Sequence, residues 1–194
     1  METEVSRATL LTPPTSEPVT LAEARKQCEL SPSDNAHDDH LTRLIQSARE
    51  QWEHDTDSCC LTQTWSVTTE GFDDDEIYLP KRPIQSITHV KYYDSNNAQQ
   101  TLSTSYYSLD PADRAVRLNY LQVWPVALQR WDAVTITYVA GYTAAANVPA
   151  IHKQAILLLV AYYFENRDML LTDAMQGCVA YERLVARFMR SSYP

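Results

Sequence analysis

Glycine is scarce in this sequence, which has only three among its 194 residues: Gly71, Gly141 and Gly177. Loops that cradle phosphate groups with backbone amides need several glycines at fixed, close spacing. Three glycines so far apart cannot form such a loop. Nucleotide-binding folds that depend on one are therefore disfavoured.

Basic side chains are outnumbered as well. The chain has 16 Lys and Arg against 25 Asp and Glu, which gives a net charge of −9. Proteins that hold nucleic acid neutralise its phosphates with a basic surface. We therefore expect no sequence-specific binding of nucleic acid, although DNA passing nearby is compatible with this composition.

Long apolar runs and a secretory signal are also missing. The apolar stretch from Ala155 to Phe164 has ten residues, whereas a membrane-spanning helix needs about 20, so we expect no membrane association. Residues 1–17 contain no apolar segment typical of a signal peptide. Without such a signal, reduced thiols are expected rather than disulfides at Cys28, Cys59, Cys60 and Cys178.

Residues 18–60 have a helical pattern, after a polar segment, 1–17, that contains two adjacent prolines and is expected to be a flexible arm. Thr20 and Glu23 fit a T-x-x-E capping box, which predicts a helix start. Farther along, apolar residues at helical spacing predict a second helix with one buried face. These residues are Leu41, Leu44, Ile45, Ala48 and Trp52.

Between residues 61 and 142 the apolar period changes from helical spacing to two. Segments rich in β-branched and aromatic residues alternate with turn sequences such as DSNN at 94–97 and DPAD at 110–113. This pattern predicts an antiparallel sheet of about five or six short strands.

From 148 to 190 the pattern is helical again, and the stretch from Ala155 to Phe164 is apolar on every side. A helix of this kind is covered on every side, either in the core of a bundle or at a subunit interface, since the two have similar compositions. The residues of this helix expected in the core or at the interface are Ile151, Ala155, Leu158, Leu159, Tyr162 and Tyr163.

The predicted fold class is therefore α+β, a bundle of about four helices interrupted by an inserted antiparallel β subdomain. Residues 18–194 would form a single domain, helical over 18–60 and 148–190, with the β insertion at 61–142.

One short motif consists of residue types that bind metal ions: His37, Asp38, Asp39 and His40. A zinc site needs three or four protein ligands, and only Asp34 adds to the two histidines locally. We favour a solvated helix start, where acidic residues suit the helix dipole. A small metal-dependent hydrolase that uses His37 and His40 is kept as an alternative.

Several segments together resemble the head-to-tail connector (head-completion adaptor) proteins of tailed bacteriophages and prophages. They are PVTLAEAR, DDHLTRLIQSARE, LTQTW, LPKRPIQSITHVKYYD, YYSLD and AVTITYVAGYTAAANVPAIHKQAILLLVAYYFENRD. The similarity runs from about Pro18 to Asp168. The sequence departs from it at TDSCC, before LTQTW, where similar proteins often have a glycine turn, and it is loose after residue 174.

The resemblance implies a structural virion protein with no active site and no cofactor or metal. Such proteins form a ring, usually of twelve copies, below the portal, extend the DNA exit channel and receive the next neck protein, a stopper or tail terminator. Viral DNA would pass through without sequence-specific binding. The protein would assemble in the host cytoplasm and reside in the virion; a tail-completion protein is a further alternative.

The resemblance also implies that the C-terminal region contacts the portal. The end of the chain is locally basic in an acidic protein and has one aromatic side chain. The residues expected at this contact are Arg187, Arg190, Tyr193 and Pro194.

Overall fold

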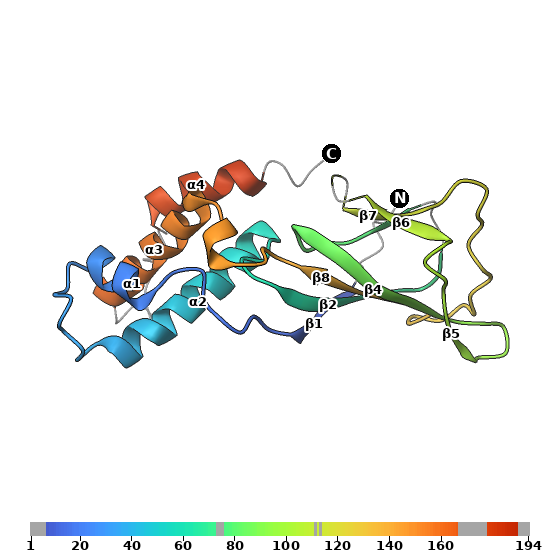
Figure 1. The fold of residues 1–194 in the computed structure, drawn as a ribbon, viewed down its shortest axis with the longest axis horizontal. Coiled ribbons are helices and arrows are strands. Elements are labelled where there is room, and N and C mark those ends of the chain that lie inside the picture. Colours follow the sequence, from blue (N-terminus) through green and yellow to red (C-terminus); the bar gives the residue numbers. More distant parts are fainter. Residues whose placement is uncertain (1–6, 73–75, 111, 113, 167–177, 190–194) are drawn as a thin grey trace. The chain divides into compact units, whose positions relative to one another are not determined.

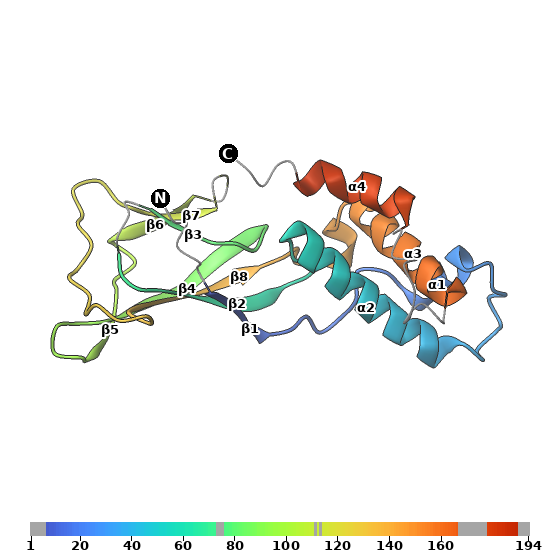
Figure 2. The same ribbon diagram turned by 180° about the vertical axis from the view of Figure 1, so that it is seen from behind.

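The computed structural model describes residues 7–72, 76–110, 112, 114–166 and 178–189. The chain forms two compact units (Figures 1 and 2). The first, here called the β unit, contains residues 1–14 and 62–142, and the second, the helical unit, contains residues 15–61 and 143–194. The predicted α+β fold class, with antiparallel sheets and four α-helices, is confirmed.

The helical unit contains the four α-helices and one 3-10 helix, η1. Their bounds are Leu21–Gln27 for α1, Asp38–Thr56 for α2, Ala145–Asn147 for η1, Ala150–Glu165 for α3 and Val179–Met189 for α4. Helix α3 packs against α1, α2 and α4. None of the helices that the structure describes has the length and apolar character needed to span a membrane.

The predicted start of α1 is confirmed in detail. The backbone N–H of Glu23 donates to the hydroxyl of Thr20 at 3.2 Å, and the backbone N–H of Thr20 donates to the carboxylate of Glu23 at 2.6 Å. Both contacts of a capping box are therefore made. In α2, the predicted apolar face is also found: Leu41, Ile45, Ala48 and Trp52 are buried, and Leu44 is half-buried.

The β unit contains two antiparallel sheets instead of the single sheet expected. One has the order β1-β2-β8-β4-β5 and the other the order β3-β7-β6. The strands are Arg7–Thr12 (β1), Gln63–Thr69 (β2), Glu76–Tyr78 (β3), Ile84–Tyr93 (β4), Gln99–Thr101 (β5), Tyr107–Asp110 (β6), Ala115–Leu118 (β7) and Val134–Ala140 (β8).

The expectation of a flexible arm at residues 1–17 is wrong for its second half. Residues 7–12 form β1, an edge strand whose register pairs Ala8 with Val67 and Leu10 with Trp65. The prolines that suggested an arm, Pro13 and Pro14, stand directly after the strand, where a missing N–H does not disturb the ladder.

Candidate assembly surfaces

Helix α3 is the first predicted site. Ala155 and Leu159 are buried within the helical unit, together with His152, whose ring packs at an angle on that of Trp52 with the ring centres 4.6 Å apart. The face of the helix that contains Leu158 and Tyr162 is different. Ile151, Leu158, Tyr162 and Tyr163 are only half-buried in the single chain. One stripe of α3 is therefore core, while the other is only partly covered.

The motif at residues 37–40 has a packing role at the start of α2. The rings of His37 and His40 lie 5.5 Å and 6.0 Å from the ring of Phe164 in α3. Asp38 accepts a hydrogen bond from Nε of Arg25 at 2.9 Å. The described residues contain no group of three or more His, Cys, Asp or Glu side chains placed to hold a metal ion.

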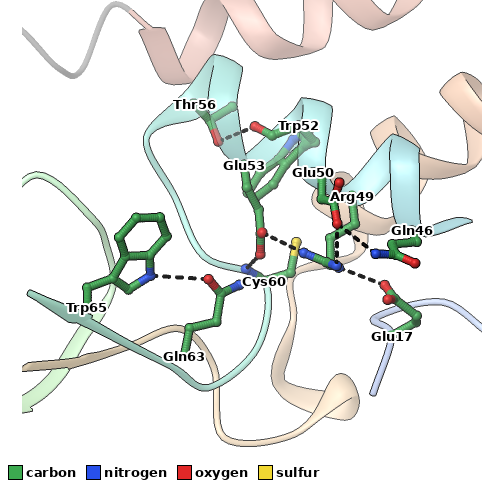
Figure 3. A network of polar contacts seen from close by, with 10 residues as sticks. All are labelled: Glu17, Gln46, Arg49, Glu50, Trp52, Glu53, Thr56, Cys60, Gln63 and Trp65. Atoms are coloured by element: carbon green, nitrogen blue, oxygen red, sulfur yellow. Dashed lines mark hydrogen bonds and ion pairs between the residues drawn. The ribbon is translucent and has the colours of Figure 1, made fainter. Parts of the chain in front are cut away.

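A buried ion-pair network, not foreseen from the sequence, fixes the start of the helical unit to α2 (Figure 3). The Arg49 guanidinium lies between two carboxylates, donating from Nε to Glu17 and from Nη1 to Glu53, each at 2.8 Å. The other Glu53 oxygen accepts the backbone N–H of Cys60 at 2.7 Å. The two carboxylates outweigh the effect of burial and raise the pKa of Arg49, so it stays charged.

The cysteines expected to be reduced are free thiols in the structure. Cys59 and Cys60 are fully buried, and burial raises the pKa of the Cys60 thiol. A thiol of this kind is protonated and unreactive at neutral pH. Their place in the fold is that of small apolar side chains.

Helix α4 is attached through its first turn. The hydroxyl of Tyr181 donates to a carboxylate oxygen of Asp55 in α2 at 2.6 Å. Burial, with the added effect of this bond, raises the pKa of Tyr181. The expected portal contacts lie beyond this anchor: Arg190, Tyr193 and Pro194 are outside the described residues, and for Arg187 only the backbone, within α4, is described.

One exposed apolar surface among the described residues was not predicted. It lies in the segment 119–131 of the β unit, between β7 and β8, where five large apolar side chains are exposed: Tyr120, Leu121, Val123, Val126 and Trp131. The sequence does contain a signal for it, because residues 118–129 lack any Asp, Glu, Lys or Arg and show neither helical nor strand periodicity.

Comparison with known proteins relates this architecture to phage assembly. A family model of phage gp6-like head-tail connector proteins matches residues 18–117. No curated protein matches the chain.

Solved structures match over nearly the whole chain. A chain in the neck of an empty GTA particle, computed with C6 symmetry, has 21% identity and a TM-score of 0.76, with 94% of each chain covered. A chain in the virion of a native gene transfer agent (GTA) particle has 19% identity and a TM-score of 0.74, with 93% of this chain and 94% of that one covered. A chain in the neck of a native GTA particle, computed with C12 symmetry, has 20% identity and a TM-score of 0.67, with 95% of this chain and 94% of that one covered.

Proposed function

The chain belongs to the phage gp6-like head-tail connector protein family, and from this premise we propose that it forms the adaptor ring at the head-tail interface of a virion. In this role it attaches below the portal, extends the DNA exit channel and provides the platform for a stopper or tail-terminator protein. A structural role of this kind agrees with the expectation that the chain is not an enzyme.

The family match carries this proposal, and the shared fold supports it. The match covers α1, α2, the strands β2 to β6 and all but the last residue of β7, and it begins after β1. The fold similarity extends over more than nine-tenths of the chain to structures of GTA necks, one computed with C6 and one with C12 symmetry. A closed ring of twelve copies satisfies both symmetries, which makes twelve the expected number.

The charge distribution suits a DNA conduit. Residues 1–60 hold 12 acidic and 5 basic side chains, a balance of −7, whereas residues 151–194 hold 4 acidic and 5 basic ones, a balance of +1. An acidic channel wall repels the DNA backbone and lets it slide. The more basic C-terminal part suits attachment to carboxylates of another protein.

For the portal contact, we place Arg187, Arg190, Tyr193 and Pro194 at the interface. Arginine pairs with carboxylates through two parallel hydrogen bonds, and a tyrosine fills an apolar pocket while keeping its hydroxyl hydrated. Helix α4, held by Tyr181 and Asp55, provides a fixed origin for this terminus.

The mass of the native particle tests the function. The purified chain is measured by native mass spectrometry alone and after mixing with portal rings. We expect one ring of twelve copies on each portal, whether or not the free chain is monomeric. A single copy, or an irregular cluster, would contradict the adaptor role.

Deletion of residues 187–194 tests the portal contact separately. The shortened chain should lose most of its affinity for portal rings, while a chain lacking residues 1–6 serves as a control with a truncation at the other end. Full affinity after the C-terminal deletion would place the contact elsewhere.

A further inference from the structure

The segment 119–131 exposes apolar side chains to an unusual degree. Five large ones within twelve residues are between 66% and 89% exposed: Tyr120, Leu121, Val123, Val126 and Trp131. Single exposed apolar residues are common on protein surfaces, whereas several of them close together in the chain favour a contact site.

This loop is held in place rather than loosely attached. The indole of Trp124 stacks on the ring of Phe72, with the ring centres 4.7 Å apart and the planes 10° from parallel. The backbone N–H of Leu128 donates to the carbonyl of Tyr93 at 2.8 Å, and the guanidinium of Arg130 lies 4.1 Å from the ring centre of Tyr93. A loop ordered before binding loses less entropy on binding, which favours a docking role.

The loop also contains a tight turn. The backbone N–H of Gln122 donates to the carbonyl of Asn119 at 3.0 Å, and Leu121, inside this turn, has a φ of 62°, in the left-handed region that is uncommon for a residue with a side chain. The side chain of Leu121 is exposed at this turn.

A second apolar surface lies at the β1 edge of the five-stranded sheet. Strand β1 is the edge strand, and its residues Leu10 and Leu11 are 42% and 53% exposed. The loop is tied to β4, which β2 and β8 separate from β1 (Figure 1). The β unit therefore presents apolar surface at two opposite places.

The two surfaces share a lack of charge, apart from Arg130 at the end of the loop, which is paired with Asp132. Residues 8–14 and 118–129 contain no Asp, Glu, Lys or Arg, although the chain has a net charge of −9. Copies of so acidic a chain repel one another, so they meet most favourably where both surfaces are neutral and apolar. A ring with rotational symmetry joins two different surfaces of each copy, one on each side.

We propose that the loop 119–131 of one copy packs against the β1 edge of the next copy around the ring. This inference rests on the proposed adaptor function and names the surfaces that close the ring. Val123 and Val126 would cover Leu10 and Leu11 of the neighbouring copy.

Cross-linking on assembled portal complexes tests the contact. The partly exposed cysteines, Cys28 and Cys178, are first replaced by serine. Leu11→Cys and Val126→Cys are then introduced, singly and together, and treated with a short bis-maleimide. The double variant should give a ladder of covalent multimers up to the size of the ring, and each single variant at most background dimers.

The outcomes separate the two proposals. A ring in the native mass spectrum without a ladder overturns the contact and leaves the adaptor function standing. A link from Val126→Cys to the portal or another neck protein also overturns it. If no ring forms on the portal, both proposals fail.

Charge substitution gives an independent measure. Val123→Glu with Val126→Glu should raise the concentration needed for ring assembly by about tenfold or more, because a buried contact would receive unpaired charges. Gln99→Glu, at an exposed position of β5, is the matched control and should assemble normally. Unchanged assembly of the double variant, with an unchanged melting temperature, would contradict the contact.

Discussion

The helical unit and the β unit differ in how many of their large apolar side chains are exposed. In the helical unit, Trp52 and Leu41 are fully covered, and even the charged side chain of Arg49 is buried between two carboxylates. Among the described residues, nine of the ten large apolar side chains that are exposed belong to the β unit, and the tenth is Val179. The β unit also has a buried core, which includes Tyr138, Ile136 and Leu79, but the exposed apolar surfaces available for assembly are concentrated on its strands and their loop.

This difference predicts that substitutions in the two units have different effects. A change in the helical core should lower the free energy of unfolding, while a change on the exposed apolar surface of the β unit should alter assembly with little effect on stability. The following substitutions test this separation, from the largest expected effect to the smallest.

The largest effect is expected for a charge placed in α3. Leu159→Asp puts a carboxylate at a buried position and should cost several kcal/mol, enough to unfold a domain of ordinary stability. Leu158→Asp, one residue away but half-buried, should cost less than half as much. Circular dichroism melts of both variants measure this, and equal losses would show that Leu158 is as deeply buried as Leu159.

A pair of tryptophans compares the two units directly. Trp52→Ala in α2 removes a fully buried ring and should cost about 3–5 kcal/mol. Trp131→Ala, next to β8 and exposed, should change the free energy of unfolding by less than about 0.5 kcal/mol. Urea titrations of both variants measure these changes in the free energy of unfolding. A large loss for Trp131→Ala would mean that the loop contributes to the stability of the single chain.

The buried ion-pair network gives the next effect. Arg49→Ala leaves the carboxylates of Glu17 and Glu53 without their cation and should cost about 3 kcal/mol. Arg43→Ala, exposed on the same helix, is the matched control and should be nearly neutral. If urea denaturation finds the two variants equally stable, the network has no net role in stability.

The smallest effect is expected at the helix cap. Thr20→Ala removes the capping box of α1 and should cost about 1 kcal/mol at neutral pH. The hydrogen bonds from the backbone and side chain of Thr20 lower the pKa of Glu23 below its ordinary value of 4.5. The stabilisation from this carboxylate is therefore present above pH 4.5 and lost as the pH falls through the lowered pKa.

The stability difference between wild type and Thr20→Ala should accordingly shrink as the pH falls through the lowered pKa of Glu23. Thermal melts at pH 3 and pH 7 measure it. A difference that is the same at both values would contradict a role for the ionised carboxylate of Glu23.

Local patterns in the sequence predicted much of the fold. The capping box at Thr20 and Glu23 depends only on residues three apart, and the apolar face of α2 only on helical spacing. The turn at DSNN is also local, since the Asp94 side chain accepts the backbone N–H groups of Asn96 and Ala98. Patterns of this range are present in the sequence itself.

Long-range pairings were not predictable in this way. Strand β1 depends on β2, more than fifty residues later in the chain, and the separation of the strands into two sheets depends on which edges meet. Apolar character on all sides of α3 did not distinguish core from interface, because both have the same composition. The exposed loop at 119–131 was missed because an apolar segment without periodicity is expected to be buried.

Hydrogen–deuterium exchange tests most directly whether the exposed apolar surfaces of the β unit are the ones used in assembly. The exchange of backbone amides is measured in the free chain and in the chain assembled on portal rings. We predict that protection rises in residues 119–131 and in β1, and stays unchanged in the buried part of α2 from Ile45 to Trp52, which is already protected in the free chain. A loop that exchanges as fast in the assembly as in the free chain, with protection gained only in α2, would contradict the account.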